Sequence, residues 1–356
     1  MGDYRLFCGD CLEVLPTLET GSVGLIVSDL PYFRVKEDAW DNHWETAAGF
    51  LAWLDRVLAE FARVLKPNGS LYVFASPQMA ARVEVTVGQR FNVLNHIVWA
   101  KPGGRAEGSE KEALRGYFPQ TERIIFAEHF NSDNYAQDGS GYEAERDKLR
   151  GFVFEPLRAY LDSERQRAGV GSAQIIEWFS QNGYPKYVTA MHSFSRSQWE
   201  LPTPENYERL RRCFHELNHG GEYLRTEYEY LRTEYEDLRR PFAVTPDVPY
   251  TDVWTFPAVR TYPGKHVCEK PLALMEHIVA VSSRPGDVVL DAFMGSGNAG
   301  VACQLQKRQF VGIDISPHWC DVARQRIERS AGQFPEKKGR GDDLAGLPMF
   351  AGMDAA

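Results

Sequence analysis

Apolar residues along the chain fall either into short continuous runs or into longer runs with helical spacing. Seven short runs rich in β-branched and aromatic residues predict strands: Tyr4–Cys8, Gly24–Ser28, Ser70–Ala75, Leu94–Trp99, Arg123–Glu128, Val288–Asp291 and Gln309–Asp314. Between the second and third runs, Thr46–Leu65 repeats apolar residues every three or four positions, which predicts an amphipathic helix that ends at Lys66-Pro67-Asn68-Gly69. Strands that alternate with helices predict an α/β fold with a parallel, doubly wound, seven-stranded sheet.

The middle of the chain, residues 131–241, separates the first five predicted strands from the last two and is polar with helical spacing. Ser172–Ser180, Tyr187–Phe194 and Glu205–Phe214 predict three short helices. This arrangement is similar to a helix-turn-helix unit, which places a short helix in a groove of DNA. The alternative is a helical insertion that serves only as a lid or a packing layer. The segment 331–356 is rich in glycine, aspartate and lysine, which predicts a disordered tail.

A seven-residue sequence, Glu-Tyr-Leu-Arg-Thr-Glu-Tyr, occurs twice in tandem at 222–228 and 229–235. The larger residues alternate at spacings of four and three, which is typical of a coiled coil: Leu224, Tyr228, Leu231, Tyr235 and Leu238. Three arginines line another face, where they would contact phosphates or a partner: Arg225, Arg232 and Arg239. Because glutamates interleave with the arginines, a solvent-exposed amphipathic helix is the preferred interpretation. Dimerisation through the Leu/Tyr stripe is a hypothesis.

Composition and charge exclude several classes of protein. The chain has 356 residues, 43% of them hydrophobic and 25% charged, as in ordinary globular proteins, and it has no apolar run long enough to predict a membrane span. The first residues lack the pattern of a signal peptide, and the six cysteines follow no disulfide spacing, so we expect reduced thiols in the cytoplasm. A net charge of -9 argues against a uniformly basic nucleic-acid binder, so any DNA contact must come from a local patch.

Near the C-terminus, a predicted strand runs through a glycine turn into a predicted helix. Gly295, Gly297 and Gly300 satisfy the G-x-G-x-x-G pattern, so a dinucleotide site is one interpretation. Asp291 at the strand end argues against it, because its charge would repel a pyrophosphate but suits an ammonium group. S-adenosylmethionine carries an ammonium, a carboxylate and a ribose, for which Asp291, the amides of the turn and Asp314 are the respective candidates. A glycine turn that binds no ligand is the remaining alternative.

A second turn, Asp29-Leu30-Pro31-Tyr32-Phe33, follows an apolar predicted strand and so lies at the ligand edge of a doubly wound sheet. The exocyclic amine of a nucleobase is a poor nucleophile because its lone pair is delocalised into the ring. Asp29 and the carbonyl of Leu30 would accept its two hydrogens and stabilise the positive charge that develops as a methyl group arrives. Tyr32 or Phe33 would stack on a base flipped from the duplex. The alternative is a turn in which Asp29 caps a helix and Tyr32 packs inward.

These two turns resemble motifs of the β group of S-adenosylmethionine-dependent DNA amino-methyltransferases, which modify exocyclic amines. Asp29-Leu30-Pro31-Tyr32 is similar to the family's Asp-Pro-Pro-Tyr, and residues 291–297 are similar to its Asp-Pro-Phe-x-Gly-Ser-Gly. The segments Gly9–Leu15, Lys270–Met275 and Phe310–Asp314 resemble further motifs of the family. The catalytic motif precedes the cofactor motif, which is the circularly permuted order of this group.

The resemblance implies a methyltransferase sheet with a helical target-recognition insertion. It implies a catalytic half at residues 1–130, a recognition region at 131–241 and a cofactor half at 242–330. The implied catalytic residues are Asp29, Leu30, Pro31 and Tyr32. The implied residues for binding S-adenosylmethionine are Asp10, Cys11, Lys270, Asp291, Phe293, Gly295, Ser296, Gly297 and Asp314. No metal is implied. Double-stranded DNA is the implied partner, and a homodimer and a cognate restriction nuclease are open possibilities.

The residue that precedes Leu-Pro-Tyr bears on the target base. Asp29 favours adenine N6, because cytosine N4 enzymes of this family usually carry serine there, and the neighbouring Ser28 keeps cytosine N4 as the alternative. Leu30 and Ala292 each replace a proline of the family motifs. Residues 266–269 also depart from the family's His-Pro-Thr-Gln.

Four polar residues outside these motifs are candidates for DNA contact. Lys101 and Arg105 lie in a glycine-rich basic loop, for which an ordinary solvent-exposed loop is the alternative. Arg196 and Gln198 carry side chains that make bidentate contacts to bases. Residues 8–11 spell C-x-x-C, but no second pair of cysteines or histidines stands at matching spacing, so we expect no zinc there.

The sequence as a whole predicts a cytoplasmic DNA methyltransferase that acts on adenine N6. A dinucleotide-dependent oxidoreductase is a rival, although no proton-handling residue for it is evident. A DNA-binding regulator with an inactive methyltransferase fold is the non-enzymatic rival.

Overall fold

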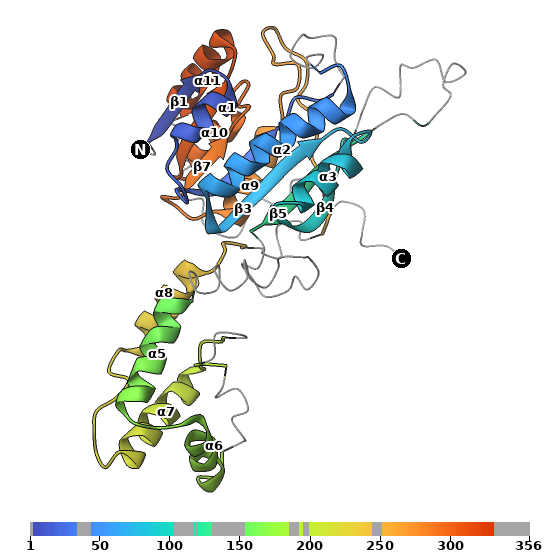
Figure 1. Ribbon diagram of the computed structural model, residues 1–356. Coiled ribbons are helices and arrows are strands. Elements are labelled where there is room, and N and C mark those ends of the chain that lie inside the picture. Colours follow the sequence, from blue (N-terminus) through green and yellow to red (C-terminus); the bar gives the residue numbers. More distant parts are fainter. Residues whose placement is uncertain are drawn as a thin grey trace, which may run out of the picture.

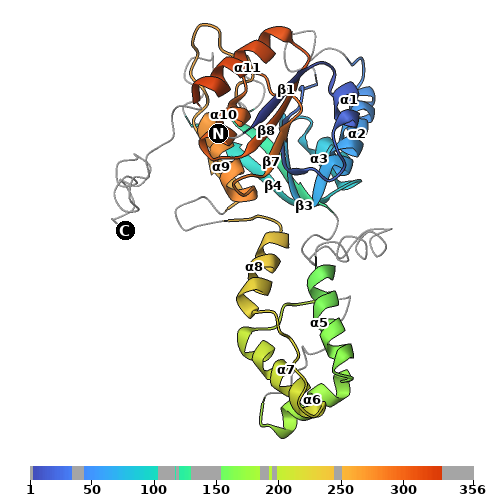
Figure 2. The ribbon, with the colours of Figure 1, turned by 90° about the vertical axis from the view of Figure 1, so that its left-hand side faces the viewer.

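The computed structural model describes residues 3–33, 44–102, 117, 120–129, 154–184, 192–194, 199–243 and 251–330. Two parts are distinct in Figures 1 and 2: a sheet with helices on both sides, and a group of four helices that projects away from it. We call residues 154–238 the helical unit and the rest of the described chain the sheet unit.

An eight-stranded sheet forms the centre of the sheet unit, in the order β1-β8-β7-β2-β3-β5-β4-β6. Its strands are β1 (Tyr4–Cys8), β2 (Val23–Asp29), β3 (Leu65–Ala75), β4 (Asn92–Ala100), β5 (Thr121–Glu128), β6 (Val253–Thr255), β7 (Val288–Asp291) and β8 (Gln309–Asp314). All seven predicted strands are confirmed, and the three-residue β6 adds an eighth beside β4.

β5 departs from the predicted parallel arrangement, since it pairs antiparallel with both β3 and β4. The other neighbouring strands pair in parallel. Alternation of strands and helices does not reveal such a reversal, because an antiparallel strand needs no helical crossover before it. Arg123 near the beginning of β5 pairs with Ala75 at the end of β3. The reversal therefore brings the first residues of β5 to the edge of the sheet where β3 ends.

Helices cover both faces of the sheet, as Figure 1 shows. One face carries α1 (Cys11–Val14), the 3₁₀ helix η1 (Leu15–Thr17), α2 (Ala47–Val64) and α3 (Ala80–Gly88), and the other carries α9 (Leu272–Ser282), α10 (Asn298–Leu305) and α11 (Pro317–Ser330). Each face has its own cluster of buried apolar residues, which makes the sheet unit a doubly wound α/β fold. Among the helices of the described ranges, none combines the length and apolar character needed to cross a membrane.

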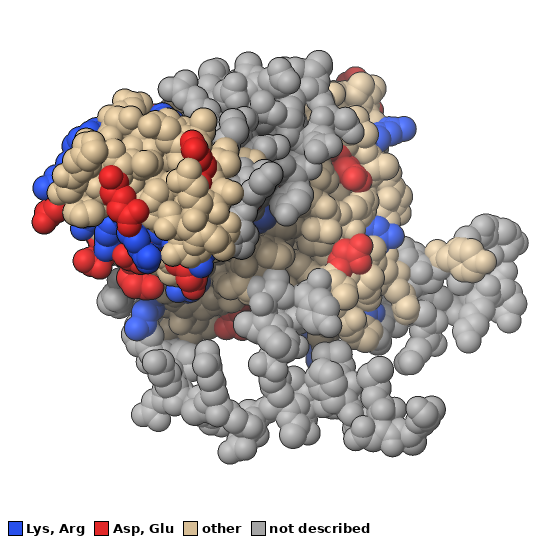
Figure 3. All heavy atoms as spheres, turned by 90° about the horizontal axis from the view of Figure 1, so that it is seen from below, with Lys and Arg blue, Asp and Glu red and all other residues tan. Residues whose placement is uncertain are grey.

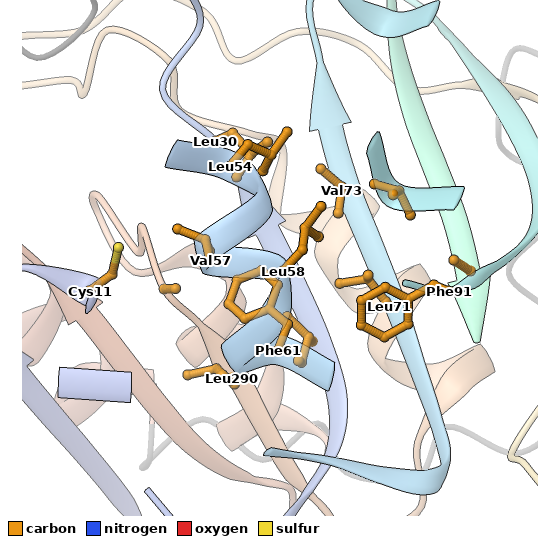
Figure 4. Packing of buried hydrophobic residues seen from close by; sticks show 14 of the residues in the cluster. Cys11, Leu30, Leu54, Val57, Leu58, Phe61, Leu71, Val73, Phe91 and Leu290 are labelled. Carbon is orange, nitrogen blue, oxygen red and sulfur yellow. The ribbon is translucent and has the colours of Figure 1, made fainter. Parts of the chain in front are cut away.

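α2 illustrates how helical spacing produces the first of these clusters. The Thr46 hydroxyl caps the helix by accepting a hydrogen bond from Gly49 N–H (3.1 Å). Its buried residues recur every three or four positions and face the sheet: Phe50, Leu54, Val57, Leu58, Phe61 and Val64. Figure 4 shows Leu58 and Phe61 beside Leu71 of β3.

The turn predicted after α2 lies within β3 instead. Leu65 pairs with Val23, whereas the next paired residue, Ser70, lies opposite Leu25. Residues 66–69 therefore bulge out of the ladder between β2 and β3, which accommodates the proline and glycine that predicted a turn.

The helical unit contains α5 (Glu155–Arg167), α6 (Ser172–Gln181), α7 (Pro204–Leu217) and α8 (Tyr228–Leu238), packed around an apolar core of their own. α6 and α7 confirm two of the three predicted short helices, and α5 was not predicted. The third predicted helix, 187–194, lies mostly outside the described residues, and 192–194 form a turn. Among the contacts that join this unit to the sheet unit, Asn68 Nδ2 donates to Leu238 O (2.9 Å) and Arg284 Nη2 donates to Glu236 O. Just after the unit, Arg240 Nε lies 2.5 Å from Glu128 Oε2.

The two copies of the repeated heptad have different structures. The second lies within α8, whereas in the first Leu224 adopts a left-handed φ of 50°. The coiled-coil interpretation is therefore wrong for the first copy. Side chains of α5 and α7 bind its backbone: Glu164 Oε2 accepts from Leu224 N–H (2.6 Å), and the Tyr207 hydroxyl donates to Thr226 O (2.8 Å). Because these backbone groups are already satisfied, they have no need of a helix's internal hydrogen bonds.

Charges of both signs are intermingled on the helical unit, as Figure 3 shows for one face. On α8, Arg232 and Arg239 lie within 4 Å of glutamates three residues earlier, at 3.9 and 3.6 Å. This agrees with the preferred interpretation of α8 as a solvent-exposed amphipathic helix.

Candidate active site

Three aspartates lie together at one edge of the sheet. Asp29 ends β2, Asp291 ends β7 and Asp314 ends β8, and these three strands are parallel neighbours. The carboxyl ends of parallel strands are where doubly wound sheets bind ligands. Residues that are 285 positions apart in the sequence therefore meet at a single site.

Asp29 is half-buried, with its side chain 17% exposed, and it is bound at only one of its two carboxylate oxygens. Lys270 Nζ donates to Oδ2 over 2.6 Å. Oδ1 is buried and has no hydrogen-bond partner within the described part of the chain. Burial raises the pKa of Asp29, and the nearby Lys270 ammonium opposes that rise. Lys270 thus holds one carboxylate oxygen, and the other oxygen can accept a hydrogen bond from a ligand.

Tyr32 lies beside this carboxylate and is itself buried, with 8% of its surface exposed. Its hydroxyl donates to Glu122 Oε2 over 2.9 Å. Burial, followed by the charges of Asp29 and Glu122, raises the pKa of Tyr32 well above its usual value, so the hydroxyl stays protonated. Lys270 Nζ lies 5.1 Å from the ring centre, within range of a cation–π contact.

Glu122 of β5 connects these groups to a second lysine. Lys270 Nζ lies 3.5 Å from its Oε2, and Lys101 Nζ forms an ion pair with its Oε1. Burial raises the pKa of Glu122, but the two lysines outweigh it and leave the pKa below its usual value. The site therefore contains two carboxylates that alternate with two ammonium groups: Asp29, Lys270, Glu122 and Lys101.

The glycine turn joins β7 to α10 and depends on two left-handed residues. Gly295 has a φ of 47° and Gly297 a φ of 82°. A Cβ on Gly297 would lie 2.8 Å from that of Ala323, so α11 packs directly against the turn. A side chain at Gly295 would meet the ring of His266, whose Cε1 would lie 3.2 Å away. Glycine is therefore required at Gly297 by its conformation and its neighbour.

Most amides of this turn are bonded within the protein. Gly295 N–H donates to Asp314 Oδ2 (2.9 Å), and Met294 N–H and Gly297 N–H donate to backbone carbonyls. The other oxygen of Asp314 accepts from Ser316 N–H (2.8 Å). The expectation that the turn amides receive a ligand carboxylate thus does not hold for these three amides, because Met294 and Gly295 anchor the turn to β8 and Gly297 bonds within the turn.

Asp291 is the most deeply placed acid of the site, with 5% of its surface exposed. Its Oδ1 accepts from Phe293 N–H (3.1 Å). Burial raises the pKa of Asp291 to about 8, and the neighbouring charges of Asp29 and Asp314 add to the rise. A bound cation would offset the free-energy cost of burying the Asp291 carboxylate, so the position is suited to an ammonium group.

A polar cluster ties the beginning of α10 to the segment before α9. Arg326 Nη2 of α11 donates to Glu269 Oε1 (3.0 Å) and to Asn298 Oδ1 (2.6 Å). Asn298 Nδ2 donates to Lys270 O (2.7 Å), and the Tyr262 hydroxyl donates to Glu269 Oε2 (2.6 Å). Asn298, next to the glycine turn, therefore binds the backbone of Lys270, and Asp29 binds its ammonium group.

The remaining predicted cofactor residues lie near this edge. Asp10 follows β1, the neighbour of β8, and caps α1 by accepting from Leu12 N–H (2.8 Å). Cys11 is buried, and burial raises its pKa to about 12. Phe293 packs against Trp53 of α2, with ring centres 5.6 Å apart. Within the described ranges, no three histidine, cysteine or acidic side chains cluster as metal ligands would.

Of the predicted DNA-contacting residues, the structure describes only Lys101, which is paired with Glu122 and lies over the Trp99 ring at 4.6 Å. Arg105, Arg196 and Gln198 lie outside the described residues.

Sequence analysis missed Glu122 and the ammonium contact of Lys270. Glu122 immediately precedes the predicted strand, and only the reversal of β5 brings it to the carboxyl end of β2. A signal existed, since Glu122 is an acid at the start of a strand with an apolar centre, but its meaning depended on strand direction.

Known proteins resemble this chain over most of its length. The family model described as DNA methylase matches residues 23–325. The DNA adenine methyltransferase YhdJ of Escherichia coli strain K12 is 25% identical over 324 residues, which cover 90% of this chain and 81% of YhdJ. The type II methyltransferase M.Cfr9I of Citrobacter freundii is 25% identical over 331 residues, covering 91% of this chain and 87% of the relative.

A solved structure with a similar fold is that of the cytosine-N4-specific PvuII DNA methyltransferase. The TM-score is 0.51 at 12% identity, and the match covers 93% of this chain and 91% of the other. At this identity the likeness concerns the fold.

Proposed function

The chain belongs to the DNA methylase family that its residues 23–325 match, and from this premise we propose that it methylates adenine N6 at a specific sequence in duplex DNA. S-adenosylmethionine is the methyl donor in this proposal. The target base is flipped out of the helix to reach Asp29, since an amine inside the duplex is not accessible to a group on the sheet edge.

The observation that carries the proposal is the free oxygen of Asp29. A buried acceptor without a partner costs about 1–3 kcal/mol, so it is retained where a ligand fills it. Oδ2 is taken by Lys270, whereas Oδ1 has no partner within the described ranges. An exocyclic amine presents the N–H donor that this oxygen lacks.

The chemistry follows from placing that amine against the turn. Asp29 Oδ1 accepts one hydrogen and the carbonyl of Leu30 accepts the other, which draws the nitrogen lone pair out of conjugation. As the N–C bond forms and the S–C bond breaks, the carboxylate stabilises the positive charge on nitrogen. The methylated nitrogen then loses one hydrogen as a proton. Asp29 is suited to receive it, because burial raises the pKa of this carboxyl group.

The residues around the glycine turn fit S-adenosylmethionine, which supplies the methyl group on its positively charged sulfur. Asp291 would bind its ammonium group, because a cation would relieve the cost of that buried carboxylate. Asp314 and Asp10, at the ends of the adjacent strands β8 and β1, would contact the ribose and the adenine side of the cofactor.

Two considerations support adenine over cytosine as the target. Asp29 occupies the position at which cytosine enzymes of this family usually carry serine. The relative named YhdJ is an adenine methyltransferase, and its similarity extends over 90% of this chain. Cytosine N4 is the alternative outcome of the test below.

The setting of the reaction belongs to the same proposal. All six cysteines are free thiols, which supports a reducing cytoplasm. We assign the catalytic half to residues 1–130, target recognition to 131–241 and the cofactor-binding half to 242–330. Arg105, Arg196 and Gln198 stay our candidates for DNA contact, as does a homodimer for the assembly. The type II relative raises the question of a cognate nuclease.

The direct test is to incubate the purified protein with S-adenosylmethionine and unmethylated bacterial DNA, digest the DNA and identify the nucleosides by mass spectrometry. We expect N6-methyladenine. N4-methylcytosine would keep the reaction and overturn the choice of base, and neither product would overturn the proposed activity.

A matched pair of variants assigns the activity to the site. Asp29→Ala should abolish the product, whereas Asp55→Ala should retain it. Asp55 is also an ion-paired aspartate, but it binds Arg90 at 2.6 Å and contacts none of the site residues. Equal activity of the two variants would contradict the role of Asp29.

A further inference from the structure

We propose that Glu122 is a positioning residue for methyl transfer, one that holds the Tyr32 side chain in place and balances the charges of Lys270 and Lys101 beside Asp29. The inference rests on the proposed function, and it adds a residue that belongs to neither of the two turns that predicted the site.

The contacts of Glu122 all lead to site residues. Its side chain is 16% exposed, and Oε2 receives both the Tyr32 hydroxyl at 2.9 Å and the Lys270 ammonium at 3.5 Å. Oε1 receives Lys101. A tyrosine side chain can swing about its Cα–Cβ bond, but a hydroxyl bound to an ion-paired carboxylate holds the far end of the ring in place. Glu122 thus holds the Tyr32 ring next to the free oxygen of Asp29.

Charge balance is the second part of the inference. With Glu122 in place, the two carboxylates and the two ammonium groups sum to zero. Without it, Lys270 and Lys101 would face Asp29 alone, and the group would carry a net positive charge where the amine itself becomes positive. Coulomb repulsion in a buried site is strong because little water screens it. Glu122 therefore lowers the energy of the charge that the reaction creates.

A neighbouring pair on the same strand shows what a purely structural glutamate looks like. Glu128, at the other end of β5, is 2% exposed and lies 2.5 Å from Arg240, which follows the helical unit. Both glutamates are ion-paired on one strand, Glu128 buried and Glu122 half-buried. Only Glu122 contacts Tyr32 and Lys270, so the two positions separate a role in the site from a role in the fold.

The test compares Glu122→Gln with Glu128→Gln in the full chain. Gln keeps the size of the side chain and an oxygen to accept the Tyr32 hydroxyl, but it removes the charge. We expect Glu122→Gln to lower kcat by roughly 10- to 100-fold, as misplaced reacting groups do, with cofactor Kd within about twofold of the unmodified protein. Glu128→Gln should leave kcat within about twofold.

The pH profile gives a readout that a structural role would not change. The groups that face Asp29 are Lys270, Glu122, Tyr32 and, at the end of β7, Asp291. Burial raises the pKa of Asp29 and the charge of Glu122 raises it further, against the opposing effect of Lys270. In Glu122→Gln the acid limb of the kcat profile should therefore move to lower pH, and in Glu128→Gln it should not move.

The outcomes separate this inference from the proposed function. If neither the unmodified protein nor Glu128→Gln methylates DNA, the proposed function fails. If both methylate DNA and Glu122→Gln has the same kcat and the same acid limb, the positioning role is wrong. If Glu122→Gln does not fold, Tyr32→Phe replaces it, since this removes only the hydroxyl that Glu122 binds. A kcat at least about threefold lower at unchanged cofactor Kd would then support the role, and an unchanged kcat would overturn it.

Discussion

Buried carboxylates occur in both units of this protein, but they are treated in opposite ways. In the helical unit, Glu164 accepts from the Arg167 guanidinium (2.7 and 3.0 Å) and from Leu224 N–H (2.6 Å), and these bonds lower its pKa despite burial. At the sheet edge, burial raises the pKa of both Asp29 and Asp291. A buried acid whose bonds are complete supports the fold, whereas one left incomplete marks the place where a ligand completes it.

This difference predicts that the sheet-edge acids contribute to activity at the expense of stability, and that Glu164 contributes to stability alone. Active sites commonly show this trade-off, because groups arranged for a ligand are poorly satisfied without it. Four sets of variants test the comparison.

The largest expected effect is that of Asp29→Asn. The amide offers an N–H or an uncharged oxygen to the amine in place of a carboxylate, so the methyl-transfer rate should fall by about 10³-fold or more. The free energy of unfolding should fall by no more than about 1 kcal/mol, because Lys270 keeps Glu122 as a counter-charge at 3.5 Å and the amide oxygen of Asn can still accept its N–H. Single-turnover kinetics and urea denaturation measure the two quantities. A large loss of stability would place Asp29 with Glu164 instead.

Asp291→Asn should weaken cofactor binding by about 10- to 100-fold, since it removes the charge that would face the ammonium group. In the unmodified protein, the carboxyl group must lose its proton to bind a cation. Because its pKa is about 8, affinity should fall as the pH is lowered from 8 to 6. The variant should lack this slope. Isothermal titration calorimetry across this pH range measures both effects.

The same variant should be more stable than the unmodified protein when no cofactor is bound. A carboxyl group whose pKa is raised on folding stabilises the fold only while protonated, and this stability is lost as the pH rises toward and past 8. Asp291→Asn should therefore gain roughly 1–3 kcal/mol at pH 8–9 and less at pH 5. Thermal denaturation at the two pH values measures this effect. A melting temperature of Asp291→Asn below that of the unmodified protein would contradict the interpretation.

Glu164→Gln should have the opposite profile to the sheet-edge variants. The neutral Gln side chain cannot form charge-assisted hydrogen bonds with the Arg167 guanidinium and the Leu224 N–H. The helical unit should therefore lose about 2–3 kcal/mol of stability. kcat on a short duplex at saturating DNA should stay within about threefold, because no sheet-edge group contacts Glu164. Comparing amide hydrogen exchange in α5 and α7 with exchange in the sheet shows whether the loss of stability is confined to the helical unit.

The smallest effect concerns the repeated heptad. Tyr207→Phe removes the hydroxyl that binds Thr226 O (2.8 Å) and should cost about 1 kcal/mol. Tyr230→Phe is the control, because Tyr230 is 66% exposed on α8 and should change stability by less than about 0.5 kcal/mol. If both changes are equal, the α7 hydroxyl is not what keeps the first heptad out of a helix.

The repeat shows where prediction from sequence stops. Local pattern suffices for the strands and for α2, because alternation and helical spacing report which face of an element is buried. It fails at Leu224 and Leu231, which occupy the same place in identical heptads and have different backbone structures. The difference comes from Glu164 and Tyr207, which are distant in sequence, and no window around the heptad contains that information.

The candidate site also has a part that local sequence predicts and a part that it does not. Asp29, Asp291 and Asp314 were predictable because each ends a recognisable strand, and neighbouring parallel strands bring their ends together. The contacts of Lys270 with Asp29, 241 residues apart, and of Glu122 with Tyr32, 90 residues apart, depend on strand direction and order. These are properties of the sheet as a whole, so the motifs led to the three aspartates and not to the contacts that Lys270 and Glu122 make with Asp29 and Tyr32.

The position of β2 between β3 and β7 also has a consequence for synthesis on the ribosome. β3 is the next strand after β2 in the chain, whereas β7 begins about 260 residues after the end of β2. Until then one side of β2 is an open strand edge with apolar residues, the kind of surface that chaperones cover and that aggregates when left free. Sheet closure and assembly of the three aspartates are the same late event, so a nascent chain that stops short of β7 has no methyltransferase centre.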